Sequence, residues 1–327
     1  MTSRRGLHRR LTAYRYYRGP TNDRAEYAMS DKTPKKASDF DPEVMKLFDQ
    51  YVHGVIDRRG FLSAAGRFAI GSAGAVGLLA ALSPNFAAAQ KVKPDDARIN
   101  TKTLEFDSPK GYVKASGYVA RPAKVERPLP VVLVIHENRG LNPHIEDIAR
   151  RLALDNFIAF APDALFPLGG YPGNEDDARA LFGKLDQAKI REDMLAAADV
   201  ARNIDGGNGK LGAVGFCYGG GIANFLATKL PSLAAAAPFY GSAPDSEEAK
   251  NIKAEMLIVL AGTDERVNAG WPDYEKALEA AGVKFALFQP GGTQHGFNND
   301  TTPRFDKDAA AEAWSKTLAL FNRKLRG

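Results

Sequence analysis

Apolar and polar residues beyond position 100 follow two different periods, which predict strands and helices in turn. The continuous apolar run at 131–135 is typical of a strand buried on both faces of a parallel sheet. Residues 142–154 instead carry apolar side chains at helical spacing, at Ile145, Ile148 and Leu152. The pattern therefore predicts a buried strand followed by a helix that packs against it.

The same periods continue to the end of the chain. Alternation over residues 102–120, around Lys110-Gly111, predicts a β-hairpin. Further strands are predicted at 157–160, 211–216, 234–240, 256–261 and 285–289. Helices are predicted at 174–187, 191–204, 222–230, 274–281 and 308–325. This alternation indicates an α/β fold with a mainly parallel central sheet and helices on both faces.

Charge divides the chain near residue 90. The 327 residues include 44 Lys and Arg and 39 Asp and Glu, and 14 of the basic and 8 of the acidic residues lie in residues 1–90. The rest of the chain is close to neutral and shows no basic stripe, so we expect no nucleic-acid partner. The single cysteine excludes an intramolecular disulfide.

Residues 57–89 have the features of an export signal. Arg58-Arg59 precede a glycine-diluted apolar run at 68–82, and Ala87-Ala88-Ala89 offer small residues at a cleavage point. This pattern resembles a twin-arginine (Tat) signal, which passes folded proteins to the Tat export machinery. The predicted location is therefore periplasmic or exported.

The chain is accordingly divided into three segments. Residues 1–56 are expected to be a disordered N-terminal extension, 57–89 the signal, and 90–327 a single α/β domain. The alternative is an uncleaved signal that anchors the protein in a membrane, although its run of about fifteen apolar residues is shorter than a spanning helix needs. Oligomeric state is left open.

A predicted strand meets a predicted helix at Gly215-Phe216-Cys217-Tyr218-Gly219, the G-x-nucleophile-x-G pattern of a nucleophile elbow. The glycines leave room for a sharp turn, and the helix N-terminus favours the thiolate of Cys217. The backbone N–H of Tyr218 is expected to donate to an oxyanion. The alternative is an unreactive, packed thiol. A P-loop is excluded because no Gly-Lys-Ser/Thr follows.

Later loops offer partners for this nucleophile. Asp264 ends a predicted strand, and His295 lies in a glycine-rich loop after the next strand. Where a nucleophile elbow occurs, the acid follows the nucleophile and the histidine comes last, so the order is that of a catalytic triad. The alternatives are a turn cap for Asp264 and a surface position for His295.

Glu137 follows the first buried strand, at the sheet edge where loops line a site. Its carboxylate is expected to face Cys217, accept the thiol proton and keep the resting thiol neutral. A salt bridge to Arg139 is the alternative. His136-Glu137 is not part of an H-E-x-x-H motif, so neither a metal nor a cofactor is expected.

Residues 100–325 resemble the dienelactone hydrolase family (carboxymethylenebutenolidases), which has the α/β-hydrolase fold. The most specific feature is the sequence G-F-C-Y-G-G at 215–220. The order of four residues also matches: Glu137, Cys217, Asp264 and His295. The resemblance implies that Glu137 takes the thiol proton and that the backbone N–H groups of Asn138 and Tyr218 form the oxyanion hole.

The substrate is less clearly implied. The family's arginines that bind a substrate carboxylate are missing from the matching stretches, 162–167 and 295–299. Arg139 and Arg304 are the candidates to replace them. The expected activity is hydrolysis of a small ester or lactone through a thioester on Cys217. A thioesterase or general carboxylesterase is the alternative in the same class, and a non-catalytic exported binding protein is the alternative in another class.

Overall fold

The computed structural model describes residues 35–68 and 74–326, and Lys35–Gly327 form one compact unit. Eight strands form one sheet in the order β1-β2-β4-β3-β5-β6-β7-β8. The pairs β1·β2 and β2·β4 are antiparallel, whereas every pairing from β4 to β8 is parallel. The predicted α/β-hydrolase fold with a mainly parallel sheet is confirmed.

The predicted strands all occur, with small shifts at their ends. Their bounds are β1 (Ile99–Ser108), β2 (Val113–Pro122), β3 (Leu129–Ile135), β4 (Ile158–Pro162), β5 (Gly207–Phe216), β6 (Leu233–Phe239), β7 (Glu255–Val259) and β8 (Phe285–Phe288). The helices that follow them are α5 (Pro143–Leu154), α6 (Glu175–Phe182), α7 (Gln187–Arg202), α8 (Tyr218–Lys229), α9 (Glu265–Asn268), α10 (Trp271–Ala280) and α11 (Lys307–Leu325).

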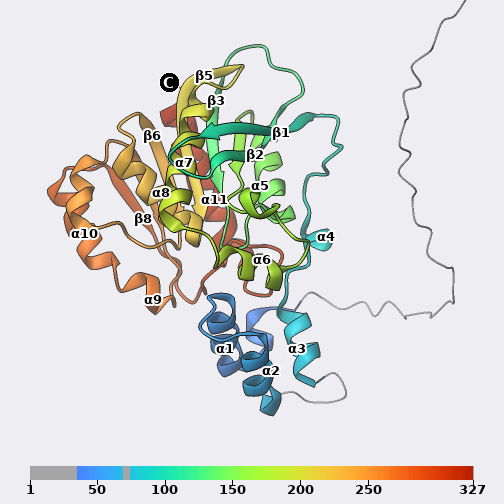
Figure 1. Ribbon diagram of the computed structural model, residues 1–327. Coiled ribbons are helices and arrows are strands. Elements are labelled where there is room, and N and C mark those ends of the chain that lie inside the picture. The colour runs from blue at the N-terminus through green and yellow to red at the C-terminus, as the bar shows by residue number, and fades with distance from the viewer. Residues whose placement is uncertain (1–34, 69–73, 327) are drawn as a thin grey trace, which may run out of the picture. The chain divides into compact units, whose positions relative to one another are not determined.

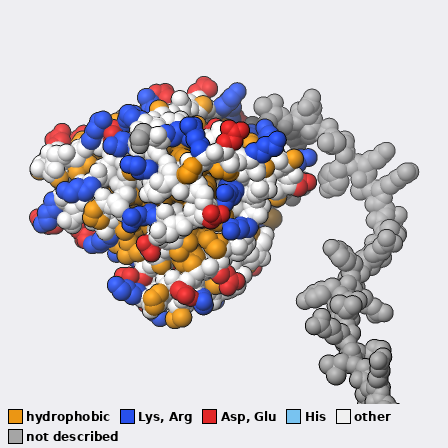
Figure 2. All heavy atoms as spheres, turned by 90° about the horizontal axis from the view of Figure 1, so that it is seen from above, with side chains coloured by type: hydrophobic (Ala, Val, Ile, Leu, Met, Phe, Trp, Pro, Cys, Tyr) orange, Lys and Arg blue, Asp and Glu red, His pale blue; other side chains and the backbone are white. Residues whose placement is uncertain are grey.

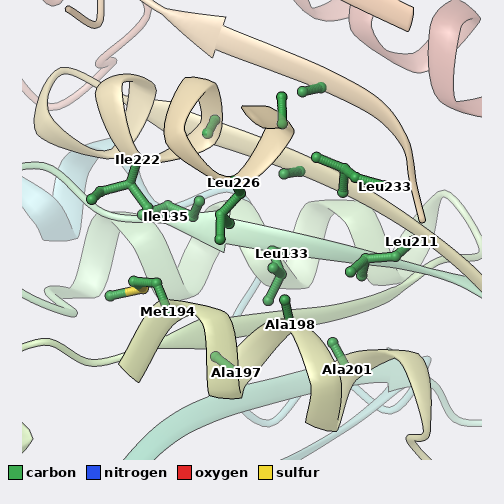
Figure 3. Packing of buried hydrophobic residues seen from close by; sticks show 14 of the residues in the cluster. Leu133, Ile135, Met194, Ala197, Ala198, Ala201, Leu211, Ile222, Leu226 and Leu233 are labelled. Atoms are coloured by element: carbon green, nitrogen blue, oxygen red, sulfur yellow. The ribbon is translucent and has the colours of Figure 1, made fainter. Parts of the chain in front are cut away.

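Helices pack on both faces of the sheet, as Figure 1 shows. One face is covered by α7, α8 and α10, and the other by α5 and α11. Figure 3 shows the small side chains Ala197, Ala198 and Ala201 of α7 facing Leu133 on β3. Alanines on this helix face let α7 approach the sheet closely, and the fully buried β3 lies between the two helical layers. The carboxyl ends of β3 and β5 are therefore positioned by strands that are packed on both faces.

Helix α8 begins at Tyr218, four residues before the predicted start at 222. Three consecutive glycines, Gly219–Gly221, open this helix, and their low helix propensity hides its first turn in the sequence. The tertiary contacts override that propensity. The first turn therefore begins directly after Cys217, as a nucleophile elbow requires.

The predicted disorder of the N-terminal extension is wrong for residues 42–52, which form α1 (Pro42–Val52). Asp41 caps this helix, and its apolar face buries Val44, Phe48 and Tyr51. This amphipathic face is the physical reason for order, because it supplies a small core of its own. Residues 1–34 lie outside the described part of the chain.

Helices also cover part of the predicted signal. They are α2 (Arg58–Ala65), α3 (Gly74–Leu82) and α4 (Phe86–Ala89), while residues 69–73 of the apolar run lie outside the described residues. Asp57 caps α2 by accepting from the Gly60 N–H, and Leu79 and Leu82 of α3 belong to the same buried cluster as residues of α1 and α2. Within 35–68 and 74–326, no helix combines the length and the apolarity that crossing a membrane requires.

On the face of the molecule that Figure 2 displays, Lys and Arg side chains are interspersed with Asp and Glu side chains. Apolar side chains appear between them in small groups.

Candidate active site

The turn between β5 and α8 gives Cys217 a backbone that few residues adopt. Its φ is 54° and its ψ is −114°, in a sparsely populated region for a residue with a side chain. A Cβ on Gly215 would lie 1.9 Å from the Gly219 carbonyl oxygen, and one on Gly219 would lie 2.2 Å from the Ile135 oxygen. Only glycine fits at these two positions. Steric exclusion therefore explains why a glycine lies two residues before and two residues after Cys217.

Two loops bring Asp264 and His295, the predicted acid and base, into contact. The Nδ1 atom of His295 lies 2.5 Å from Oδ2 of Asp264, and the two residues are only 6% and 7% exposed. The other carboxylate oxygen of Asp264 caps α9 through the Val267 N–H at 3.3 Å. Asp264 therefore caps a turn and orients the imidazole at the same time. The Cys217 sulfur and a ring nitrogen of His295 lie within 4.8 Å of each other.

The pKa values of Cys217 and His295 favour an ion pair between these two residues. Burial raises the pKa of the Cys217 thiol, but the neighbouring His295 and His53 outweigh burial and hold the pKa well below its usual value. Burial lowers the pKa of His295, whereas the Cys217 thiolate and Asp264 together raise this pKa to about 9. At neutral pH the structure thus favours a thiolate beside an imidazolium.

Glu137 lies in the same cavity as Cys217 and His295, at the end of β3. Its Oε2 accepts a hydrogen bond from the Asn299 amide at 3.2 Å. The alternative salt bridge does not form, because Arg139 pairs with Glu175 instead, at 3.6 Å. The sequence predicts a neutral resting thiol, whereas the structure favours a thiolate beside an imidazolium. The imidazoles of His295 and His53 lower the pKa of the Cys217 thiol by more than burial raises it.

The residues expected to form the oxyanion hole flank the nucleophile. Asn138 follows Glu137 after β3, and Tyr218 is the first residue of α8. Both line a cavity together with Cys217. The N–H groups in the first turn of a helix have no intrahelical acceptor, so the Tyr218 amide is suited to an anion.

The structure adds a residue that the sequence pattern did not single out, His53, directly after α1. Its Nε2 lies 3.3 Å from Nε2 of His295 and 3.9 Å from Sγ of Cys217. Its Nδ1 lies 2.8 Å from the Asp49 carbonyl oxygen. The sequence prediction places His53 in the N-terminal extension, outside the domain expected to carry the function. The helix-start signal Asp41-Pro42 and the amphipathic spacing that follows were the available indications of order.

The two arginines predicted to bind substrate also contact α1. Arg139 donates to the Val52 carbonyl oxygen at 3.0 Å, and Arg304 lies 3.5 Å from Asp49 and over the Phe48 ring. Both guanidinium groups are buried and line one cavity with Cys217. Within the described residues, neither Nε has a hydrogen-bond partner. The Nε of Arg139 lies 3.6 Å from the Glu175 carboxylate, so the two arginines contribute positive charge to this cavity.

Cys217 lies where two cavities meet. The larger, of 710 Å³, is lined by Asn138, Tyr218 and the loop that begins at His53. The smaller, of 360 Å³, contains Glu137 and the two arginines. The thiol is thus accessible from two sides, which suits a substrate with one group on each side of its reacting carbonyl.

Comparison with known proteins identifies relatives of this chain. The family model described as "Dienelactone hydrolase family" matches residues 115–325, and one described as "YqhI-like" matches residues 32–69, which include His53. The chain is 34% identical over 234 residues to a "Putative carboxymethylenebutenolidase" of Aquifex aeolicus, covering 68% of this chain and 98% of that protein.

A second relative, protein usf of Aquifex pyrophilus, is 34% identical over 233 residues, covering 68% of this chain and 98% of that protein. Among solved structures, the dienelactone hydrolase from Anabaena variabilis has a TM-score of 0.54 and 21% identity, covering 70% of this chain and 99% of that chain. The structural likeness supports the fold, while the family model extends over the elbow and the residues around it. The chain belongs to the dienelactone hydrolase family of α/β-hydrolases.

Proposed function

We propose that this hydrolase cleaves a small ester or lactone through a Cys217-His295-Asp264 triad and a thioester intermediate. The observation that supports this reading most strongly is the strained elbow, which presents the thiol between a buried imidazole and two cavities. A thiolate in this setting is a ready nucleophile, because no proton has to be removed first.

Acylation begins when the Cys217 thiolate adds to the carbonyl carbon and the carbonyl oxygen becomes an oxyanion. The backbone N–H groups of Asn138 and Tyr218 stabilise that charge. The carbon–oxygen bond then breaks, and the imidazolium of His295 gives its proton to the leaving alkoxide. The products of this step are an alcohol, a thioester on Cys217 and a neutral imidazole.

Deacylation uses the neutral imidazole as a base. His295, held by Asp264, takes a proton from water, and the resulting hydroxide adds to the thioester carbon. Collapse of this adduct releases the carboxylic acid and restores the thiolate. Since a thiolate leaves far more readily than an amine, esters and thioesters are expected to react faster than amides.

The substrate expected for this site carries an anionic group on one side of the ester. Arg139 and Arg304 line the smaller cavity together with Cys217, and both guanidinium groups carry positive charge there. A carboxylate there would receive charge-assisted hydrogen bonds. Paired aryl esters that differ only in a terminal carboxylate test this point: the carboxylate should lower KM, and Arg304→Ala should remove that advantage.

Mass spectrometry of the protein under denaturing conditions tests the intermediate. Incubation with an activated ester should add one acyl group to Cys217, and Cys217→Ala should abolish both the adduct and turnover. Full esterase activity in Cys217→Ala would refute the proposed chemistry. A thioesterase or general carboxylesterase would show instead as a preference for acyl thioesters or uncharged esters in the same screen.

A non-catalytic binding protein on the same scaffold predicts a different result. Its Cys217 would react with iodoacetamide no faster than an ordinary exposed thiol at neutral pH. The lowered pKa of this thiol favours rapid alkylation instead.

We further propose that the protein is exported through the Tat machinery, with residues 57–89 as its signal. The support is the sequence pattern of Arg58-Arg59, the apolar run and the alanines before Gln90. Replacing both arginines by lysine should keep the protein in the cytoplasm, and the N-terminal sequence of exported protein should begin near Gln90. Exported protein that retains its whole N-terminus would favour the membrane-anchored alternative.

A further inference from the structure

Three ligand-type side chains converge at the mouth of the site. His53, Cys217 and His295 each place a nitrogen or sulfur atom within 4.8 Å of the other two. His53 comes from the segment after α1, and the other two belong to the proposed triad. Imidazole nitrogen and thiolate sulfur are the donors that borderline-soft ions such as Zn²⁺ prefer.

We propose that, in the full-length chain, before a cleavage near Gln90 would remove His53, these three residues form a binding site for a zinc-class divalent ion. The ion would join the N-terminal segment to the nucleophile and its base, and would thereby stop hydrolysis. No H-E-x-x-H motif marks this site in the sequence, because its ligands come from three distant segments.

The distances fit tetrahedral coordination. Zn–N bonds of about 2.05 Å and a Zn–S bond of about 2.3 Å place two nitrogens about 3.3 Å apart and nitrogen and sulfur about 3.6 Å apart. The observed separations are 3.3 Å between the two Nε2 atoms and 3.9 Å between His53 Nε2 and Cys217 Sγ. These two separations are within a few tenths of an ångström of the ideal values, and the third, between Cys217 and His295, is within 4.8 Å. Three protein ligands leave a fourth position for water.

The second nitrogen of each imidazole is held as in known metal sites. His295 Nδ1 contacts the Asp264 carboxylate at 2.5 Å, and His53 Nδ1 contacts the Asp49 carbonyl oxygen at 2.8 Å. Such partners fix the ring and direct Nε2 toward the metal. Both rings therefore present Nε2 to the same point, beside the sulfur.

Arg266 opposes metal binding. Its Nη2 lies 2.9 Å from Nε2 of His53 and donates a hydrogen bond to the nitrogen that the ion would use. The ion must displace this donor and also overcome its positive charge. Removal of the guanidinium should therefore strengthen metal binding, an effect that a purely structural role of Arg266 would not produce.

The test uses the full-length protein after treatment with a chelator. Titration with Co²⁺ should produce a thiolate-to-metal charge-transfer band and the visible absorption of tetrahedral Co²⁺ at one equivalent, and Zn²⁺ should displace it. His53→Ala should bind Co²⁺ at least about tenfold more weakly. Arg266→Ala should bind more tightly. Lys46→Ala, an exposed change on α1, should match the parent.

Unchanged Co²⁺ affinity in a folded His53→Ala protein would overturn the site, since Cys217 and His295 alone would then hold the ion. Weaker binding by Arg266→Ala would also overturn it, and this result does not depend on how His53→Ala folds. Loss of hydrolysis on adding Zn²⁺, reversed by chelator, is expected as well but rests on the proposed function. Absence of hydrolysis in metal-free protein would refute that function while leaving the metal titration decisive for the site.

Discussion

The hydrogen bond between His295 and Asp264 makes a quantitative prediction possible. In Asp264→Asn, the side chain keeps its size and an oxygen acceptor but loses its charge. A hydrogen bond from a buried imidazolium to a carboxylate contributes about 3 kcal/mol. Because about 1.36 kcal/mol corresponds to one pKa unit, the pKa of His295 should fall by about two. From about 9, it would move to about 7.

The consequence for activity follows from the sign of this change. In the parent, the imidazolium persists up to about pH 9, so kcat/KM for an activated ester should stay level at neutral pH and fall above that value. In Asp264→Asn the fall should begin near pH 7, because half of the imidazolium is already lost there. The loss of tautomer control should lower the maximal rate by about 100-fold or more.

The assay is the pH profile of kcat/KM with an aryl ester, measured together with the rate of iodoacetamide alkylation. Alkylation reports the Cys217 thiolate without turnover, and its pH midpoint should rise in Asp264→Asn. Asp273→Asn, an exposed change on α10, is the control and should match the parent in both measurements. An Asp264→Asn profile with the parent's alkaline limb and rate would refute the assigned role of this carboxylate.

Three further outcomes are expected. Cys217→Ser should lower kcat/KM by more than about 100-fold and abolish iodoacetamide labelling, since a hydroxyl at this position is not ionised; near-parent activity would contradict a thiolate mechanism. Gly219→Ala should lower the free energy of unfolding by about 1–3 kcal/mol, because the new Cβ would lie 2.2 Å from a backbone oxygen of β3. Gly221→Ala is the control and should keep the parent Tm and activity, because its Cβ would lie 3.6 Å from the nearest atom. Equal effects of the two changes on thermal unfolding would argue against the steric account. Arg139→Ala should raise KM for an ester bearing a carboxylate more than for its neutral analogue, and a uniform change in steady-state kinetics would exclude an anion-binding role.

Local sequence determined the elements and the elbow. The buried run of β3 and the alternation of strands with helices predicted the sheet, because burial on both faces demands continuous apolar residues. Glycines at 215 and 219 marked the turn, since their backbone lies too close to neighbouring oxygens for any side chain. The chain order of Cys217, Asp264 and His295 identified the three side chains that the structure brings together.

Tertiary structure alone decided what lies opposite the nucleophile. His53 and Cys217 are 164 residues apart, and no periodicity in either segment indicates that they meet. The apolar stretch after Arg58-Arg59 suggested a signal, yet α1, α2 and α3 share a small core that only their packing reveals. Likewise, the partners of Arg139 and Arg304 on α1 depend on where that helix lies over the sheet. The physical reason is that local propensity and period specify which surfaces are apolar, whereas polar contacts between distant segments exist only after those surfaces have packed.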